Sequence, residues 1–250
     1  MKRPAKQNTK RTNPRRHDMA FTAEAIIANI ESRLGQGGAH VWNFYGLARG
    51  TAWCAGEVSY TFNKTGNKSK WYGGKPVFYV PYAQQWMAKN YKTIYDYRKG
   101  GNLANVRKGD VVIFMWDRGS RDHIGFARAT GKAGELYTIE GNTSGGIVAK
   151  RTRAKKYIYA VYRPPYKAAP KPTGKYTGTI PTPTLKYGSK GTQVKYLQQF
   201  LNWYLKEKLA VDGSFGPATS SALKQFQSME GISVDGIYGK QSQSKANKYK

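Results

Sequence analysis

The apolar residues of the chain change their spacing once, near Lys99-Gly100-Gly101, and this change limits the folds that the chain can adopt. Before this point, apolar residues recur every three or four positions in residues 22–34 and 54–62, which predicts two helices. After it, four short runs have the composition and length of strands, and their short, turn-rich connections favour antiparallel pairing. Helices followed by strands predict an α+β domain. The four strand runs are 111–116, 123–129, 135–142 and 156–163.

The chain of 250 residues is long enough for one ordinary domain and a small second one. Residues 1–18 carry seven Lys or Arg and no large apolar side chain, so we predict a disordered basic arm. Residues 19–166 form the expected α+β domain. Residues 167–184, rich in Pro, Gly and Thr, are expected to be a semi-extended linker. Residues 185–250 are the expected small domain.

The small domain contains an internal repeat of the pattern V-D-G-x-[FY]-G, at residues 211–216 and 234–239. Each copy precedes a helix-like run, and a further helix is predicted from Thr192 to Leu205, so the expected unit has three helices. The repeated acidic and aromatic residues are candidate substrate contacts. The alternative is that the Asp-Gly pairs only make turns and that the aromatic residues are core. The candidates are Asp212, Phe215, Asp235 and Tyr238.

The formal net charge of +28 favours polyanionic partners, which include nucleic acid, anionic membranes and the anionic polymers of a bacterial wall. A single cysteine excludes an intramolecular disulfide, and three histidines with one cysteine do not make a zinc cluster. The basic start is not followed by an apolar run of the length that a signal peptide needs, and we expect neither a signal peptide nor a transmembrane segment.

The cysteine, Cys54, lies where a helix is predicted to begin. Free N–H groups and the helix dipole favour a thiolate there, so Cys54 is a candidate nucleophile. The alternative is an inert, buried thiol. Of the histidines, His17 falls in the basic arm and His40 in a Gly-rich connection, which leaves His123 as the candidate base. Trp53, directly before the cysteine, is a candidate substrate contact.

A third polar group is needed to orient a catalytic imidazole. Alternation along the strand that begins at His123 places this side chain on the face opposite Ile124. Glu140 and Asn142 lie two residues apart on the next strand run and so share one face, which becomes the face of His123 if the two strands are neighbours. The sequence therefore offers a nucleophile, a base and orienting groups in one order along the chain.

The segments TAWCAGEVSYTFNKTG, KGDVVIFMW, DHIGFA, TIEGNTSG and YAVYRPPY resemble the CHAP domain, a papain-like cysteine amidohydrolase and peptidase domain of bacterial and phage wall hydrolases. The resemblance covers residues 21–166. It implies helices packed on an antiparallel sheet, with the nucleophile at Cys54, the base at His123, the orienting acid at Glu140 and a supporting amide at Asn142.

The segment from Leu185, LKYGSKGTQVKYLQQFLNWY, together with both V-D-G-x-[FY]-G copies, is similar to the type 1 peptidoglycan-binding domain. Some CHAP domains bind calcium through acidic residues just before the cysteine. From Leu34 to Cys54 this chain has no acidic residue, so we expect no calcium there, no other metal and no cofactor.

The resemblance implies a phage-type endolysin that cleaves an amide of peptidoglycan, either the N-acetylmuramoyl-L-alanine bond or a bond of the stem peptide or cross-bridge. Such a protein is expected to stay in the host cytoplasm until lysis and then to act on the wall as a monomer, without nucleic acid as a partner. The alternatives are a bacterial wall-remodelling hydrolase, an interbacterial toxin, or a basic nucleic-acid-binding protein, for which no recognition element is apparent.

Overall fold

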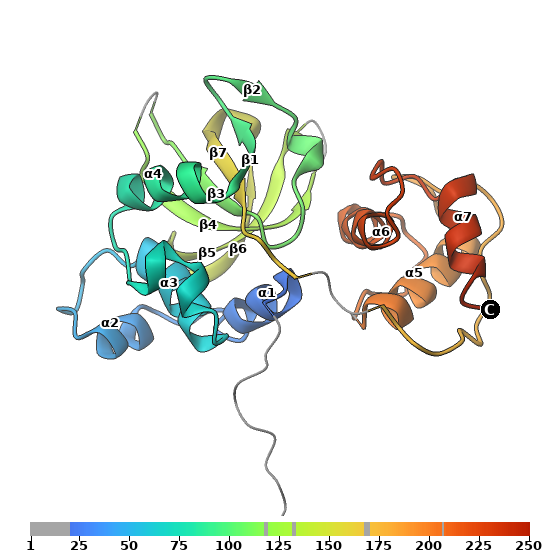
Figure 1. Ribbon diagram of the computed structural model, residues 1–250, viewed down its shortest axis with the longest axis horizontal. Helices are drawn as coiled ribbons and strands as arrows, with labels where there is room; N and C mark the ends of the chain where they lie inside the picture. The colour runs from blue at the N-terminus through green and yellow to red at the C-terminus, as the bar shows by residue number, and fades with distance from the viewer. Residues whose placement is uncertain (1–20, 118–119, 132–133, 168–170, 207) are drawn as a thin grey trace, which may run out of the picture.

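The computed structural model describes residues 21–250 except 118–119, 132–133, 168–170 and 207. The predicted basic arm, residues 1–18, lies outside the described residues. Figure 1 shows a larger unit built on a sheet and a smaller unit of helices joined to it by the segment after the last strand. None of the helices in the described residues is long and apolar enough to span a membrane.

The two helices predicted in the first part of the chain are present, and two more accompany them. Thr22 caps the first helix, because its hydroxyl accepts a hydrogen bond from the backbone N–H of Ala25 at 3.2 Å. The helices that were not predicted are short or have many polar residues, and Pro81 lies in the first turn of one of them. The four are α1 (Ala23–Glu31), α2 (Ala39–Tyr45), α3 (Cys54–Lys64) and α4 (Val80–Asn90), and short 3-10 turns lie at Lys68–Lys70, Tyr72–Gly74, Leu103–Asn105 and Lys155–Tyr157.

Within the described residues, seven strands form one sheet in the order β2-β1-β7-β3-β4-β5-β6, and every pairing is antiparallel. The predicted α+β class and antiparallel sheet are thus confirmed. All four predicted strands are present as β3, β4, β5 and β7. The bounds are β1 (Lys92–Asp96), β2 (Gly100–Gly101), β3 (Val111–Phe114), β4 (His123–Thr130), β5 (Leu136–Thr143), β6 (Ile147–Arg153) and β7 (Ile158–Arg163).

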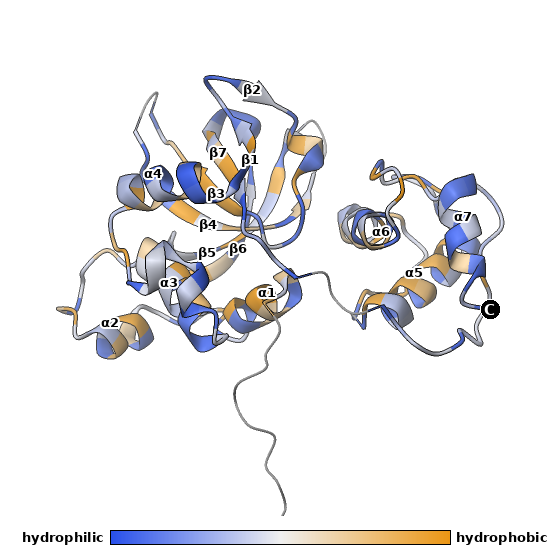
Figure 2. Cartoon of the chain, in the orientation of Figure 1, coloured by the Kyte–Doolittle hydropathy of each residue, from blue (hydrophilic) through white to orange (hydrophobic). Residues whose placement is uncertain are grey.

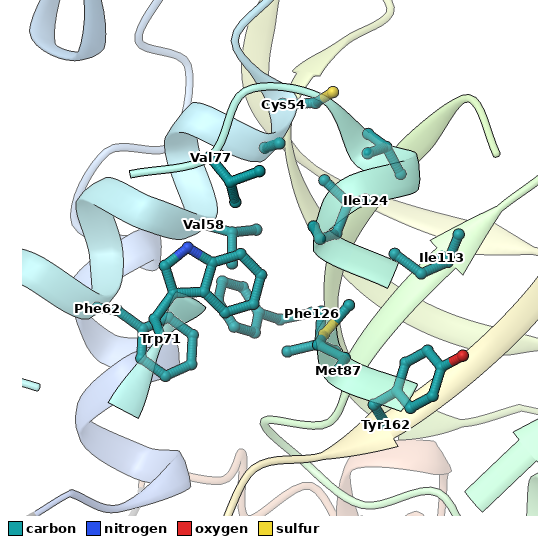
Figure 3. Packing of buried hydrophobic residues seen from close by; sticks show 14 of the residues in the cluster. Cys54, Val58, Phe62, Trp71, Val77, Met87, Ile113, Ile124, Phe126 and Tyr162 are labelled. Carbon is teal, nitrogen blue, oxygen red and sulfur yellow. The ribbon is translucent and has the colours of Figure 1, made fainter. Parts of the chain in front are cut away.

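The two faces of the sheet are covered differently. On one face, apolar strand residues such as Ile124 and Phe126 pack against the helices, and the Phe62 ring stacks on Trp71 with centroids 5.1 Å apart. Figure 3 shows Cys54 at the edge of this cluster, beyond Val58 and Val77. The other face carries a smaller cluster: Tyr95, Leu103, Val106, Val112, Phe114, Ala127, Leu136, Ile158 and Val161. Packing of α3 on β4 and β5 therefore holds the start of α3 beside one end of these strands.

The smaller unit contains three helices among its described residues, α5 (Thr192–Leu205), α6 (Pro217–Met229) and α7 (Lys240–Asn247). Figure 2 shows hydrophobic residues along α5 and a mostly hydrophilic α7. The second half of the expected linker differs from an open tether. Tyr176 and Ile180 are buried in the core of this unit, and the Tyr176 ring packs 5.4 Å from that of Phe200. Part of the expected linker, from Tyr176 to Ile180, therefore packs against the helices, because its apolar side chains are buried between them.

Candidate active site

Cys54 is the first residue of α3 and is 7% exposed. The preceding residue, Trp53, provides no side-chain hydrogen bond that would cap this helix. The first N–H groups of a helix lack partners within the helix, so the start of α3 favours a negative charge on the sulfur. The helix is anchored behind the cysteine by Ser59, whose hydroxyl accepts a hydrogen bond from the Trp71 indole at 2.8 Å. The thiol thus sits at a fixed point of the fold.

His123 begins β4 opposite Phe114 of β3, and it is 6% exposed. Its Nε2 lies 3.0 Å from Oε2 of Glu140, and Cys54 is the other neighbour that acts on its pKa. Burial alone would lower the pKa of His123. The hydrogen bonds and negative charges of Cys54 and Glu140 outweigh this effect and raise the pKa to about 9. The imidazole is therefore held as a cation between the sulfur and the carboxylate.

Glu140 lies in the middle of this group and is fully buried. Burial by itself raises the pKa of Glu140, but hydrogen bonds from His123, Arg153 and Thr138 lower it to about 2. Arg153 of β6 donates from Nε to Oε1 at 2.9 Å and from Nη2 to Oε2, so the contact is bidentate. The carboxylate stays ionised in the interior because these donors and cations surround it.

Gly125 of β4 makes room for the Glu140 side chain. A Cβ atom at Gly125 would lie 2.6 Å from Cγ of Glu140, closer than atoms can approach. The pairing of β4 with β5 brings these residues together across neighbouring strands. The sequence analysis placed His123 and Glu140 on one face if their strands were neighbours. The two strands, β4 and β5, are neighbours, and the two side chains share one face.

Asn142 lies in the same cleft as His123, but regular strand alternation does not place it there. The register of β5 with β6 shifts between Glu140 and Thr143, and Asn142 has a left-handed backbone with φ of 55°. Simple alternation therefore does not hold between Glu140 and Asn142. Asn142 nevertheless lines a cleft of about 440 Å³ together with His123, and its side chain makes no hydrogen bond to the other described residues. The remaining lining residues are Trp116, Thr143, Ser144 and Arg153.

Arg153 and Trp116 were missed by the sequence reasoning. Trp116 is 45% exposed, its ring stacks on Phe114 at 4° between planes, and the Arg153 guanidinium lies 4.7 Å from its centroid. Arg153 belongs to β6, a strand with too few apolar residues to be recognised, so nothing in its local sequence indicates that it meets Glu140. The exposed tryptophan after a strand was the one available signal.

A second buried polar group, centred on Glu57, lies one turn along α3 from Cys54. Glu57 is fully buried and accepts hydrogen bonds from Arg33 Nε at 3.0 Å and from Arg33 Nη2 at 2.6 Å. Its other oxygen contacts Nε2 of His40, the histidine that the sequence analysis rejected as the catalytic base. The Nδ1 of His40 lies 2.9 Å from the Gly37 carbonyl oxygen. These contacts tie α1 and α2 to the helix that carries Cys54.

Trp53, expected as a substrate contact, is 2% exposed and packs edge-on against the His40 ring. A Cβ atom at Gly141 would lie 2.7 Å from the Trp53 ring and 2.6 Å from the Glu57 side chain. The indole is therefore part of the packing between α3 and β5, and the structure gives it no exposed face for a ligand.

The repeated motif residues of the smaller unit hold its turns and core. Phe215 and Tyr238 are 1% and 0% exposed, so they pack inside the unit rather than lie on its surface. Asp212 accepts a hydrogen bond from the backbone N–H of Ser214, and Asp235 accepts one from Ile237, so both acids make turns. The four residues are therefore placed as the alternative interpretation described: the acids make turns, and the aromatic residues are core.

Two buried glutamines, which the sequence reasoning missed, make the same pair of hydrogen bonds in each copy of the motif. Gln198 donates to Asp212 at 2.8 Å and accepts from the Gly213 N–H at 2.9 Å. Gln227 donates to Asp235 at 2.7 Å and accepts from the N–H of Gly236 at 2.9 Å. The copies are therefore a structural repeat, in which a glutamine of the preceding helix fastens each Asp-Gly turn.

Residues 190–243 match the family model described as a putative peptidoglycan binding domain. This match confirms the expected kind of domain near the C-terminus. The expected papain-like CHAP fold of the larger unit has no such match and stays a prediction.

Three curated proteins are similar to parts of the chain. A zinc D-Ala-D-Ala carboxypeptidase of Streptomyces albus G is 47% identical over 22% of the chain, and the N-acetylmuramoyl-L-alanine amidase CwlL of Bacillus licheniformis is 31% identical over 46%. An autolytic lysozyme of Clostridium acetobutylicum is 48% identical over 18%. The chain spans only 23%, 37% and 14% of these relatives' own lengths.

Among solved structures, a periplasmic domain of the EpsAB fusion protein of the Vibrio vulnificus type II secretion system matches 55% of each chain at 14% identity, with a TM-score of only 0.26. The name of one curated relative includes zinc, so metal-ligand geometry is relevant. In the described part of this chain, no group of three His, Cys, Asp or Glu side chains is placed to hold a metal ion.

Proposed function

We propose that the chain is a peptidoglycan hydrolase that cleaves an amide through a Cys54 thiolate. The observation that carries this proposal is the contact series from Cys54 at the start of α3 to His123 and on to the buried Glu140. The match of residues 190–243 to a peptidoglycan-binding family, and the wall-hydrolase names of the relatives, support the choice of substrate.

In the first half of the reaction, the sulfur of Cys54 attacks the carbonyl carbon of the amide and forms a C–S bond. The carbonyl electron pair moves onto oxygen, where the free backbone N–H of Cys54 is a candidate donor. As the intermediate collapses, the C–N bond breaks and the His123 imidazolium gives its proton to the leaving nitrogen. The products are a free amine and a thioester on Cys54.

In the second half, neutral His123 takes a proton from water, and the hydroxide attacks the thioester. The C–S bond breaks, and Cys54 returns to the thiolate beside imidazolium. The carboxylic acid that leaves loses its proton to solvent, and the released amine takes one up, so the products are a carboxylate and an ammonium group. Glu140 stays ionised throughout and holds the imidazole in place, and Arg153 keeps that carboxylate fixed. Asn142 lines the cleft at the side of His123.

The finer parts of the proposal follow from the resemblance to CHAP domains. We assign the chain to a phage-type endolysin with a catalytic unit at residues 19–166 and a wall-binding unit at the C-terminus, acting on the wall during host lysis. The bond cleaved is the N-acetylmuramoyl-L-alanine amide or an amide of the peptide part.

Selective alkylation of the single thiol tests the chemistry. Iodoacetamide has no other cysteine to modify, so treated protein should lose clearance of wall suspensions while it keeps its melting temperature and still pellets with walls. Full clearance by protein that mass spectrometry shows to be alkylated would refute the thiolate mechanism.

A further inference from the structure

A cleft of about 440 Å³ lies between the two units, and none of its lining residues belongs to the site described above. One wall comes from the larger unit and includes Tyr166 and Pro164. The other wall is α6 of the smaller unit. Figure 1 shows α6 as the helix of the smaller unit nearest to the sheet.

One face of α6 makes the contacts between the units. Ser221 donates to the Arg128 carbonyl at 3.0 Å, Lys224 donates to the Ala104 carbonyl at 3.0 Å, and Ser228 accepts from Arg107 at 2.6 Å. These three residues of α6 are spaced by three and four positions, so they share one face of the helix. The contacts are polar, and they place charged side chains at the border of the cleft.

The lining of the cleft is strongly basic. Its two acids are already engaged: Asp110 pairs with Arg163 at 2.7 Å, and Glu24 accepts a hydrogen bond from Gln225. The six basic residues that line the cleft are Lys92, Arg107, Lys108, Arg163, Lys167 and Lys224. Positive charge therefore exceeds negative charge at this place by a wide margin.

Arg107 and Lys224 are half-buried, and neither makes a salt bridge with a carboxylate of the described residues, although Asp110 attracts Arg107 and Asp235 attracts Lys224. Arg107 donates to the Ser228 hydroxyl, one helical turn from Lys224, so the two cations are neighbours. Desolvation, and then repulsion by Arg163, lowers the pKa of Arg107, and desolvation likewise lowers that of Lys224. An anion between the two cations would relieve this cost.

We propose that the cleft binds a phosphate group of an anionic wall polymer, held by Arg107 and Lys224, with Lys92 and Lys167 at the rim. A phosphate presents several oxygens and can accept from a guanidinium and an ammonium group at once. The apolar surface of Pro164, Tyr166 and Met229 suits the carbon chain between successive phosphates. The site would add a second wall contact to the peptidoglycan-binding family match, and it is independent of the proposed hydrolysis.

The test measures binding of the full chain to poly(glycerol phosphate) at one moderate salt concentration. The variant Arg107→Gln/Lys224→Gln removes the proposed site. The matched control Lys68→Gln/Lys70→Gln removes the same charge from exposed positions on the first 3-10 turn, and Lys92→Gln/Lys167→Gln removes the exposed rim. Because two charge-assisted contacts are lost, we expect affinity to fall about tenfold or more for the first variant, about threefold for the rim and less than twofold for the control.

Equal losses in the site variant and the control would show general charge attraction and overturn the proposal, as would an unchanged affinity in the site variant. A single-stranded oligonucleotide of equal phosphate number serves as a second probe, and a higher affinity for it, lost in the site variant, would make the cleft a nucleic-acid site and overturn the proposal. If melting curves show that the site variant is unfolded, the rim variant decides by the same criteria. Clearance of walls stripped of phosphate polymers should be equal in all variants, which keeps this test separate from that of hydrolysis.

Discussion

At the residue scale, the account depends on how Glu140 acts on His123. Because Glu140 accepts from His123 at 3.0 Å while Asn142 makes no such bond, Glu140→Gln should lower kcat roughly a hundredfold and Asn142→Ala much less. Glu135→Gln, a half-exposed position just before the same strand, is the control. Comparable, negligible losses for Glu140→Gln and Glu135→Gln would remove the orienting role from Glu140.

The pH profile adds a readout that a purely structural role would not move. The pKa of His123, ordinarily 6.5, is raised to about 9, so the imidazolium is present below that pH and is lost as the pH rises through it. Activity should therefore decline on the alkaline side near pH 9. Removing the charge of Glu140 lowers the pKa of His123, so the alkaline limit in Glu140→Gln should move to lower pH. The raised pKa of His123 also stabilises the fold: this contribution is fully present below pH 6.5 and is lost as the pH rises from 6.5 to about 9.

At the scale of elements, the close approach of β5 to α3 depends on Gly141. A Cβ atom there would meet Glu57 and Trp53 within 2.7 Å, so Gly141→Ala should cost about 1–3 kcal/mol of the free energy of unfolding and shift the start of α3. Gly174→Ala, at a position with open space and no left-handed backbone, is the control. Urea titrations of both variants measure the difference, and a Gly141→Ala protein as stable as the control would contradict this packing.

The elements that the sequence revealed were those whose own residues carry a pattern. The strands β3, β4, β5 and β7 are rich in apolar side chains, and α1 begins directly after Thr22, a residue type that often caps helices. The last strand of the sheet order, β6 (IVAKRTR), is mostly polar, so its own sequence carries only a weak strand pattern.

The candidate site divides in the same way. Cys54, His123 and Glu140 could be predicted as site residues because residue type and strand alternation can be read from one segment of the sequence at a time. Arg153 could not be selected, because its contact with Glu140 depends on the pairing of β5 with β6. The displacement of Asn142 depends on a backbone irregularity that residue type does not specify.

At the scale of the whole molecule, the C-terminal unit should matter most when the substrate is an insoluble wall. A bound module raises the local concentration of substrate for the attached catalytic unit. A shortened chain of residues 1–167 should therefore keep its rate on soluble muropeptides but lose most clearance of walls at low enzyme concentration. Raising the salt concentration separates this effect from charge attraction, which weakens with ionic strength. Equal clearance by both chains at moderate salt would show that the C-terminal unit is not a tether.

The central claim, that Cys54 carries the cleavage of a wall amide, is tested most directly by mass spectrometry of purified walls digested with the parent protein and with Cys54→Ala. The parent should release fragments with one new amine and one new carboxylate at a single kind of amide, which also identifies the bond. Cys54→Ala, folded and still pelleting with walls, should release none of these fragments. The same fragments at a comparable rate from Cys54→Ala would contradict the account.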